Sequence, residues 1–455
     1  MKVSYIVSSK KYMIKEKLLS PFQKFVNLQS SSGILLLATT IIALVWANSA
    51  FSESYQSFWQ YELGFISDSF ELKKPLILWV NDGLMAIFFF LIGLEIKREF
   101  LIGELNSTKK IMFPLFGAIG GIALPVLIYV ILNQNPDTLK GWGIPMATDI
   151  AFSLAILKVL GNRVPLSLKI FLTAFAIVDD LGAVLVIAIF YSSSLNFVLL
   201  GSAFGLLAII YFLSYRGLYF EFLTIVSGFI VWLLFLKAGL HPTLAGILMA
   251  FAIPVRQKIS THEFTDQLES IVGEIKDSTI LQKPVLSPKQ LELIDDLDGW
   301  ADKYRSPLQH LEHKLHNWVA YLIIPIFALA NAGVAINSDG GLETALIVNI
   351  MICLILGKSI GISTVIFLAR KFKIIDVPED ITNKQIIGVS FLAGIGFTMA
   401  IFIASLAFNS SPEYIDSAKI GILIGSFISA IIGFGILRFN TVKGKFDHSP
   451  LEKKE

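Results

Sequence analysis

About twelve blocks of apolar residues constrain this sequence more than any other feature. Crossing the roughly 30 Å hydrocarbon core of a bilayer takes about 20 residues of helix, and these blocks approach or exceed that length. Of the 455 residues, 55 % are hydrophobic and 16 % charged, and the charges fall mainly between the blocks. The pattern excludes an ordinary soluble domain and predicts an all-α, polytopic membrane protein. The predicted spans are 32–48, 78–97, 111–132, 144–160, 167–192, 195–213, 219–237, 240–255, 315–335, 343–369, 386–408 and 415–437.

The lysine and arginine residues predict the orientation of these spans. Basic residues are retained on the cytoplasmic side, and here nearly all of them fall at alternate connections. Both termini are therefore expected in the cytoplasm, which requires an even number of spans. The first apolar block follows a basic, polar start and is interpreted as a retained span, without a cleavable signal peptide. The other side of the membrane holds only Lys73, Lys74, Lys140, Lys237 and Lys419.

Two stretches outside the spans have a character of their own. Residues 57–76 mix aromatic and polar side chains and predict a β-hairpin, with strands at 58–66 and 70–74 flanking the turn SDS. The hairpin is a candidate surface for a homodimer, with an ordinary loop as the alternative. Residues 257–305 form a charged insertion, in which Ser287 before Pro288 predicts the start of a helix over 288–304. We interpret the insertion as a soluble appendage, with regulation or partner binding as the alternative.

The expected organisation follows from these boundaries. The single cysteine, Cys353, lies in an apolar block, so no disulfide within one chain is expected. The net charge of +2 gives no indication of a nucleic-acid partner. The predicted parts are a membrane domain over 1–256 (spans 1–8), the cytoplasmic insertion 257–305, a second membrane part over 306–440 (spans 9–12) and a cytoplasmic tail, 441–455.

Three ionisable residues lie near the middle of predicted spans. Placing such a group deep in a membrane costs at least about 2.5–3.5 kcal/mol, so each one suggests a function. Asp179 and Asp180 are neighbours on one helix and point about 100° apart, which suggests two different roles. Lys358 needs a carboxylate partner at that depth, and either aspartate is suitable. Two carboxylates and one amine leave one carboxylate for a monovalent cation or a proton; the alternative is an ion pair that only fixes helix packing.

A fourth acidic residue, Asp149, follows Thr148 in a span that glycine and proline interrupt. In a second span Gly394 and Gly396 precede Thr398 in the same manner. Paired interruptions of this kind indicate inverted repeats with a binding site where two discontinuous helices cross at mid-membrane, and we expect the repeats to be 111–192 and 343–437. A carboxylate at the crossing could offset the positive helix termini, which is an electrostatic role distinct from ion binding.

At these residues the chain resembles the NhaA family of sodium/proton antiporters, over nearly all of its length except 257–305. The resemblance implies that Asp179 and Asp180 bind the ion and carry protons, that Lys358 pairs with Asp179, and that Thr148 and Asp149 lie at the crossing. The stretches that carry it are NDGLMAIFFFLIGLEIKRE (81–99), ATDIAFSLA (147–155), FAIVDDLGA (175–183), GLHPTLAG (239–246), LEHKLHNWVAYLIIPIFALANAG (311–333), GKSIGI (357–362) and GIGFTMAIFIASLAF (394–408).

The resemblance also assigns residues to a pH response. It implies a cytoplasmic funnel with Glu95, Arg98 and Glu312, and modulating roles for Asp82 and His241. Histidine is suited to a pH response, because it changes charge near neutral pH. Glu95 and Arg98 are otherwise read as interfacial charges three residues apart, and His241 as the residue that opens its helix. The charged insertion before Glu312 departs from the compact family pattern.

The function that the resemblance implies is transport and not enzymatic catalysis. It implies electrogenic export of Na⁺, and of Li⁺, in exchange for H⁺ by alternating access in a bacterial inner membrane, with no cofactor. An intramembrane aspartyl protease also needs two buried aspartates, but on different helices and in a GxGD-type context, whereas VDD places the pair side by side. A passive cation channel would show no obligatory coupling to protons.

Overall fold

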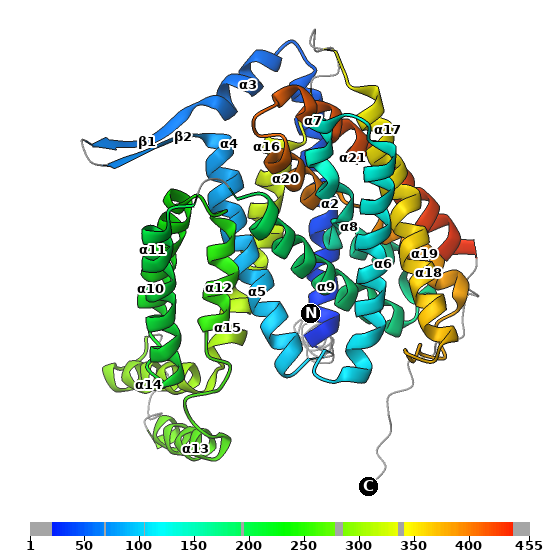
Figure 1. The fold of residues 1–455 in the computed structure, drawn as a ribbon. Helices are drawn as coiled ribbons and strands as arrows, with labels where there is room; N and C mark the ends of the chain where they lie inside the picture. The colour runs from blue at the N-terminus through cyan, green and yellow to red at the C-terminus, as the bar shows by residue number, and fades with distance from the viewer. Residues whose placement is uncertain are drawn as a thin grey trace, which may run out of the picture. The chain divides into compact units, whose positions relative to one another are not determined.

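The computed structural model describes residues 21–67, 70–103, 105–192, 195–277, 285–334 and 341–439, and the regular structure of these residues is helical apart from one hairpin (Figure 1). The all-α class predicted from the apolar blocks is confirmed. The tail 441–455 and most of the basic N-terminal stretch lie outside the described residues. The chain divides into two compact units, which are described separately.

The first unit combines residues 1–85, 99–193 and 319–455. Among its described residues, three short segments are π-helical and two are 3₁₀-helical. Its elements are α2 (Pro21–Ala47), α3 (Ser52–Gln60), β1 (Glu62–Ser67), β2 (Phe70–Pro75), α4 (Leu76–Leu78), η1 (Trp79–Leu84), α6 (Thr108–Leu132), α7 (Pro136–Leu139), η2 (Lys140–Met146), α8 (Ile150–Leu160), η3 (Gly161–Arg163), α9 (Leu166–Phe190), η4 (Val319–Ile323), α16 (Ile324–Asn331), α17 (Thr344–Ile352), η5 (Cys353–Gly357), α18 (Lys358–Lys371), α19 (Asn383–Ala393), α20 (Phe397–Ala407) and α21 (Pro412–Phe439).

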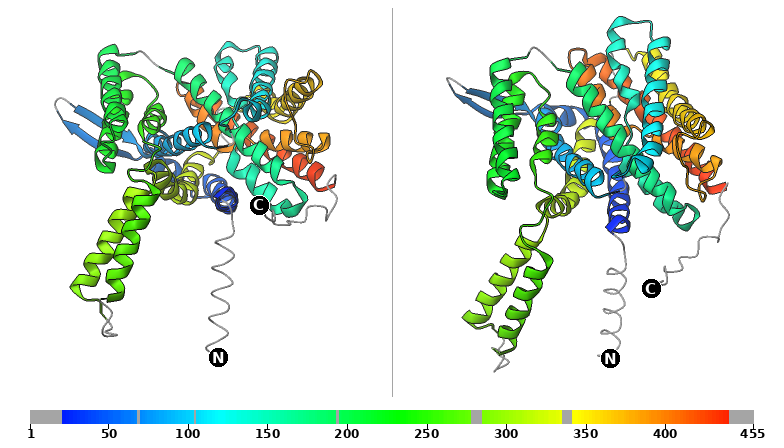
Figure 2. Two further views of the ribbon diagram at one scale, coloured as in Figure 1. Left: turned by 90° about the horizontal axis from the view of Figure 1, so that it is seen from below. Right: turned by 60° about the horizontal axis from the view of Figure 1, so that its bottom comes forward.

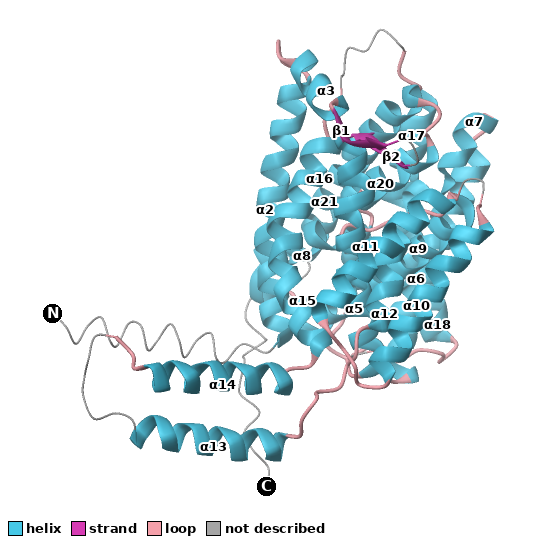
Figure 3. Cartoon of the chain, turned by 90° about the vertical axis from the view of Figure 1, so that its left-hand side faces the viewer, coloured by secondary structure: helices cyan, strands magenta, loops and turns pink. Residues whose placement is uncertain are grey.

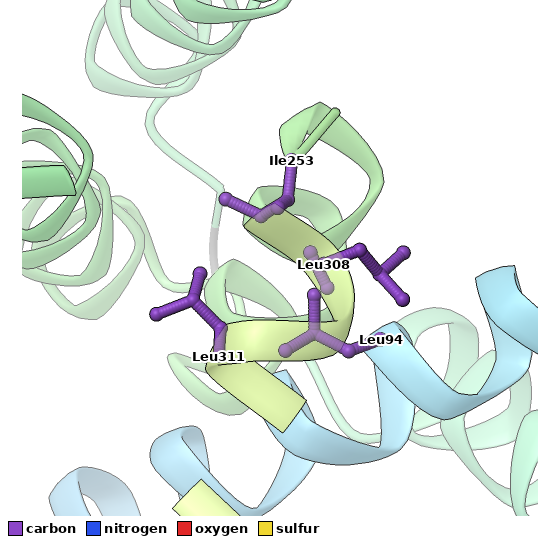
Figure 4. Packing of buried hydrophobic residues seen from close by; sticks show 5 residues of the cluster. Leu94, Ile253, Leu308 and Leu311 are labelled. Carbon is purple, nitrogen blue, oxygen red and sulfur yellow. The ribbon is translucent and has the colours of Figure 1, made fainter. Parts of the chain in front are cut away.

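The second unit combines residues 86–98 and 194–318, and so includes most of helix α5 (Met85–Leu101). Leu94 of α5 packs with Ile253, Leu308 and Leu311 in a buried apolar cluster (Figure 4). This cluster holds the two ends of the insertion together, because residues 253 and 308 flank it. The other elements are α10 (Phe197–Tyr215), α11 (Glu221–Ala238), α12 (Thr243–Ala252), α13 (Thr261–Asp277), α14 (Pro288–Tyr304) and α15 (Pro307–Trp318).

The helices fit the predicted spans closely. Among the described residues, seven unbroken helical stretches are long and apolar enough to cross a membrane, and three bent pairs raise the number to ten. All twelve predicted ranges contain helix. Two predicted spans are not among these ten. They are 240–255, where α12 has only 10 residues, and 315–335, which begins in the polar helix α15.

Close packing of α6 against α18 explains two glycines in the first unit. A Cβ on Gly120 would collide with the carbonyl oxygen of Gly361, and a Cβ on Gly361 with that of Gly120. Small residues at such a crossing let helix backbones approach each other in a membrane, where packing rather than hydrophobic burial drives association. This contact fixes α18, which carries Lys358, against the helix that precedes the first broken span.

The hairpin within 57–76 is present, but it begins later than predicted. The two strands β1 and β2 are present (Figure 3). They pair antiparallel, with Glu62 opposite Pro75 and Ser67 opposite Phe70. The turn at 68–69 lies outside the described residues. Residues 58–60, which we expected in the first strand, belong to helix α3, because Tyr55 and Trp59 lie one helical turn apart and are both buried.

The helix predicted at the end of the insertion is confirmed. Helix α14 begins at Pro288, and Ser287 and Gln290 form a capping box, in which each side chain accepts a hydrogen bond from the other residue's backbone N–H (3.3 and 2.9 Å). Helix α13 packs beside α14 (Figure 2), with the rings of Phe264 and Tyr304 stacked 4.3 Å apart.

Candidate ion-binding site

Two spans of the first unit are interrupted, as the glycines and prolines predicted. The first bends by 42° between residues 136–146 and helix α8, and the second bends by 43° between α19 and α20. Short non-helical links join the halves, from residue 147 to 149 and from residue 394 to 396. Interrupted helices expose backbone N–H and C=O groups that require other partners. The two interrupted spans supply many of these partners to each other.

The first broken span satisfies carbonyl groups at the end of α19. Its donors are the backbone N–H of Asp149 and the hydroxyl groups of Thr148 and Ser153, and Thr148 and Asp149 directly precede α8. A helix leaves its last four carbonyls without partners in the helix, so groups at this end of α19 and in the link after it can accept from elsewhere. The three bonds run from Thr148 Oγ1 to Ala393 O (2.9 Å), from Asp149 N to Ile395 O (2.6 Å) and from Ser153 Oγ to Leu392 O (2.8 Å).

The carboxylate of Asp149 serves the first turns of two helices. It is the N-cap of α8, where its Oδ1 accepts from the backbone N–H of Phe152 at 3.2 Å. Its Oδ2 accepts from Thr398 of α20 twice, from the backbone N–H at 3.1 Å and from the hydroxyl at 2.5 Å. A negative group is favourable at a helix N-terminus, and here one buried carboxylate lies at two of them.

Asp179 and Lys358 form an ion pair that is closed to solvent. Lys358 Nζ lies 2.9 Å from Asp179 Oδ2, and neither side chain has any exposed surface. Lys358 also donates to the hydroxyl of Thr148, and its ammonium lies 5.9 Å from the ring centroid of Phe175, within the range of a cation–π contact. Lys358 is the first residue of α18 after the π-helical segment η5, and such segments often mark functional positions.

The two aspartates of α9 differ in their surroundings. The second oxygen of Asp179, Oδ1, has no hydrogen-bond partner among the residues that the structure describes. Asp180 is also buried, at 3 % exposure, and its carboxylate interacts electrostatically with the ammonium of Lys358. Two buried carboxylates beside one ammonium leave a negative charge in excess, which a metal cation or protons can neutralise.

Glu95, Arg98 and Glu312, to which the resemblance assigns a pH response, lie in the second unit. Arg98 Nε lies 3.0 Å from Glu312 Oε2, and Glu95 Oε1 lies 3.7 Å from His316 Nδ1, with both members of the second pair buried. Glu95, Arg98 and Glu312 were expected from the family resemblance, whereas His316 was not. The spacing could have indicated His316, because residues four apart on a helix share a face and His316 follows Glu312 by four.

Asp82 and His241 belong to different units and have other partners. Asp82 belongs to the π-helix η1 of the first unit and pairs with Lys74 at 2.8 Å, while His241 of the second unit lies with its Nδ1 2.6 Å from the hydroxyl of Thr243. Next to Asp82 lies Asn81, which was not predicted as a site residue; its side-chain amide exchanges hydrogen bonds with that of Asn331 (3.2 and 2.8 Å).

Bent helices that cross, with a lysine and two aspartates buried beside the crossing, define a polytopic membrane transport protein. The family model described as Na+/H+ antiporter 1 matches residues 23–437. The chain belongs to this family, which confirms the resemblance seen in the sequence.

Similar proteins cover nearly the same length. The chain is 45 % identical over 426 residues to the Na(+)/H(+) antiporter NhaA of Oleidesulfovibrio alaskensis, an alignment that covers 93 % of this chain and 94 % of that protein. It is 44 % identical to the Na(+)/H(+) antiporter NhaA of Sulfurimonas denitrificans, with 93 % and 96 % covered. For the Na(+)/H(+) antiporter NhaA of Salmonella paratyphi A the identity is 42 %, with 91 % and 97 % covered.

Proposed function

We propose that this protein exchanges Na⁺ for H⁺ across a membrane, and that Asp179 and Asp180 carry either the sodium ion or the protons. The observation that carries the proposal is the buried pair of Asp179 and Lys358 beside a second buried carboxylate. Membership of the Na+/H+ antiporter 1 family supports the identity of the ions. Sodium and protons are substrates here, and the mechanism assigns no step to a cofactor.

Exchange follows from competition for the same oxygens. A sodium ion needs the carboxylates in their ionised form, and protons remove that form, so occupancy by one species displaces the other. Lys358 holds Asp179 when neither sodium nor a proton occupies that carboxylate, which keeps a buried charge from standing alone. When sodium binds, Asp179 exchanges the ammonium for the metal ion, and Thr148 remains as a partner for Lys358.

Access to the site alternates between the two sides of the membrane. The broken helices provide the movable part, because their halves are joined by short links instead of continuous helix. Asp149 stays in place and offsets the positive ends of α8 and α20 in both states. The inverted relation of 111–192 and 343–437 is part of this proposal; both consist of a continuous span, a broken span and a second continuous span.

The proposed direction and stoichiometry follow from the charges. Two protons on the two carboxylates, exchanged for one sodium ion, move net charge, so the membrane potential drives sodium out of the cell. Lithium is a second substrate, because carboxylate oxygens bind small hard cations. We place the protein in a bacterial inner membrane with both termini in the cytoplasm, consistent with its basic loops.

The second unit supplies the pH response in this proposal. The pairs formed by Arg98 with Glu312 and by Glu95 with His316 join helix α5 to helix α15, and a change of charge in either pair alters the attraction between the two helices. Asp82 and His241 modulate the exchange. The insertion 257–305 leads directly into helix α15, which carries Glu312 and His316.

Twofold association through the hairpin β1–β2 is a further part of the proposal. The side chains of Leu63, Phe65 and Ile66 are exposed, Phe65 to 80 %. Apolar side chains on an exposed hairpin are typical of a surface that another chain covers. Crosslinking of a cysteine introduced at Phe65 to the same residue of a second copy tests this assignment.

Purified protein reconstituted into liposomes tests the exchange itself. Addition of sodium should collapse an imposed pH gradient, and Asp180→Asn should abolish the collapse. Sodium flux without proton movement would indicate a passive channel, and peptide cleavage that depends on Asp180 would indicate a protease. Full exchange by a protein in which both Asp179 and Asp180 are neutralised would disprove the proposed carrier pair.

A further inference from the structure

Helix α20 begins at a residue that cannot cap it. The N-cap is Gly396, which has no side chain, and a Cβ at that position would lie 2.9 Å from the Cβ of Ala400 and 3.1 Å from the carbonyl oxygen of Ala147. Most helices are capped by the side chain of their own N-cap residue. The N–H groups at the start of α20 therefore need acceptors from elsewhere in the first unit.

Helix α21 supplies one of these acceptors. The hydroxyl oxygen of Ser426 accepts hydrogen bonds from the backbone N–H groups of Gly396 and Phe397, each at 3.2 Å, and Ser426 is buried. The next N–H, that of Thr398, donates to Asp149 at 3.1 Å. Three consecutive N–H groups are thus divided between a neutral acceptor and a charged one.

We propose that Ser426 is a positioning residue for the ion site. It holds the link between α19 and α20, whose carbonyl at Ile395 accepts the N–H of Asp149. Thr148, next to Asp149, donates to Ala393 and accepts from Lys358, so a shift of the link reaches the ammonium through two hydrogen bonds. This inference rests on the proposed function, because the property that Ser426 sets is the affinity for sodium.

The charge at the crossing gives the expected direction of the effect. Without the hydroxyl of Ser426, two N–H groups at the positive end of α20 lose their acceptor. Their partial positive charge then remains uncompensated at the crossing, and Asp149 is drawn away from Thr398 toward them. Both changes disfavour a cation near the crossing, so sodium binds more weakly while the exchange step itself remains.

The same helix contains a matched control. Ser429 lies three residues after Ser426 on α21 and has no exposed surface, and its hydroxyl oxygen has no hydrogen-bond partner among the described residues. Replacement of either serine by alanine removes one buried oxygen from α21. Only the change at Ser426 removes the acceptor of the backbone N–H groups of Gly396 and Phe397 at the start of α20.

The experiment compares Ser426→Ala, Ser426→Thr and Ser429→Ala with the wild type in proteoliposomes. We expect Ser426→Ala to raise the apparent KM for sodium about fivefold to tenfold, the size expected when buried donors lose an acceptor, with the maximal rate changed less than about twofold. Ser426→Thr keeps the hydroxyl and should restore the KM, and Ser429→Ala should leave it unchanged. Should Ser426→Ala fail to fold, Ser426→Cys, with its weaker acceptor, replaces it with the same expected direction.

A second measurement does not depend on transport. Sodium should raise the Tm of the solubilised full-length protein, and at equal sodium concentration the rise should be smaller in Ser426→Ala than in Ser429→Ala. Equal KM values and equal sodium-dependent Tm shifts in these two variants overturn the role of Ser426, whatever the wild type transports. A wild type that shows sodium-dependent Tm shifts but no exchange overturns the proposed function and leaves the role of Ser426 to be decided by the shifts.

Discussion

One carboxylate oxygen of Asp149 accepts both the backbone N–H and the hydroxyl of Thr398, a residue 249 positions away in the sequence and in the other interrupted span. The other oxygen caps Asp149's own helix, α8. Asp149 therefore connects the two broken helices by hydrogen bonds and carries the negative charge that their first turns require.

We expect Asp149→Ala to lower the stability of the protein by about 1–3 kcal/mol, because three buried donors lose their acceptor. Sodium/proton exchange should fall with it. Thr398→Val, which removes the hydroxyl but keeps the backbone N–H, should have the smaller effect on both properties. Thermal unfolding of the purified variants and dequenching of a pH dye in proteoliposomes provide the measurements. Wild-type stability and activity in Asp149→Ala would contradict this assignment.

Lys358→Met should destabilise the protein by about 3–5 kcal/mol, since it leaves Asp179 without its buried partner. The double variant Lys358→Met, Asp179→Asn removes both charges and should regain part of the lost stability. Neither variant should exchange sodium for protons. The Tm values of the two variants are the test, and a double variant less stable than Lys358→Met would show that the pair does not behave as a buried ion pair.

His316→Gln should flatten the pH profile of exchange, because glutamine cannot carry the positive charge of an ion pair with Glu95. His313→Gln is the matched control, since His313 lies on the same helix and is exposed. The initial rate of exchange, measured from pH 6 to pH 8.5 at saturating sodium, compares the two. The same flattening in both variants would rule out a specific role for His316.

Gly361→Ala should destabilise the protein by about 1–3 kcal/mol, because the added methyl group meets the backbone of Gly120 and forces α6 and α18 apart. Gly205→Ala, on helix α10, meets no atom within 4 Å and should be neutral or slightly stabilising. Thermal unfolding in one detergent distinguishes the two. An equal loss of stability would show that the effect comes from the backbone of any helical glycine rather than from this crossing.

The helices were largely predictable because their signals are local. The apolar blocks gave all twelve helical ranges, and Ser287 with Pro288 gave the start of α14, since capping involves residues three apart. The strand predicted at 58–60 was wrong, because these residues belong to helix α3, which buries Tyr55 and Trp59 on one side. A short run of aromatic residues alone does not distinguish a helix from a strand.

Which side chains meet could be predicted only where the chemistry forced it. A lysine deep in a span needs a carboxylate, so the sequence limited Lys358 to Asp179 or Asp180, and the structure places it against Asp179. Nothing local distinguished Ser426 from the other serines of its helix. Its partners, Gly396 and Phe397, are 30 and 29 residues away, so its role as an acceptor arises from the packing of α21 against α20.

The sequence by itself therefore determined that the chain is a helical membrane protein, where its helices break, and which charges lie deep within it. These are properties of composition and local spacing, which depend on the cost of exposing polar groups to lipid. Tertiary structure decided the pairings at the crossing, from Asp149 with Thr398 to Ser426 with the start of α20. Their donors and acceptors come from different helices, so only packing brings them within hydrogen-bond distance.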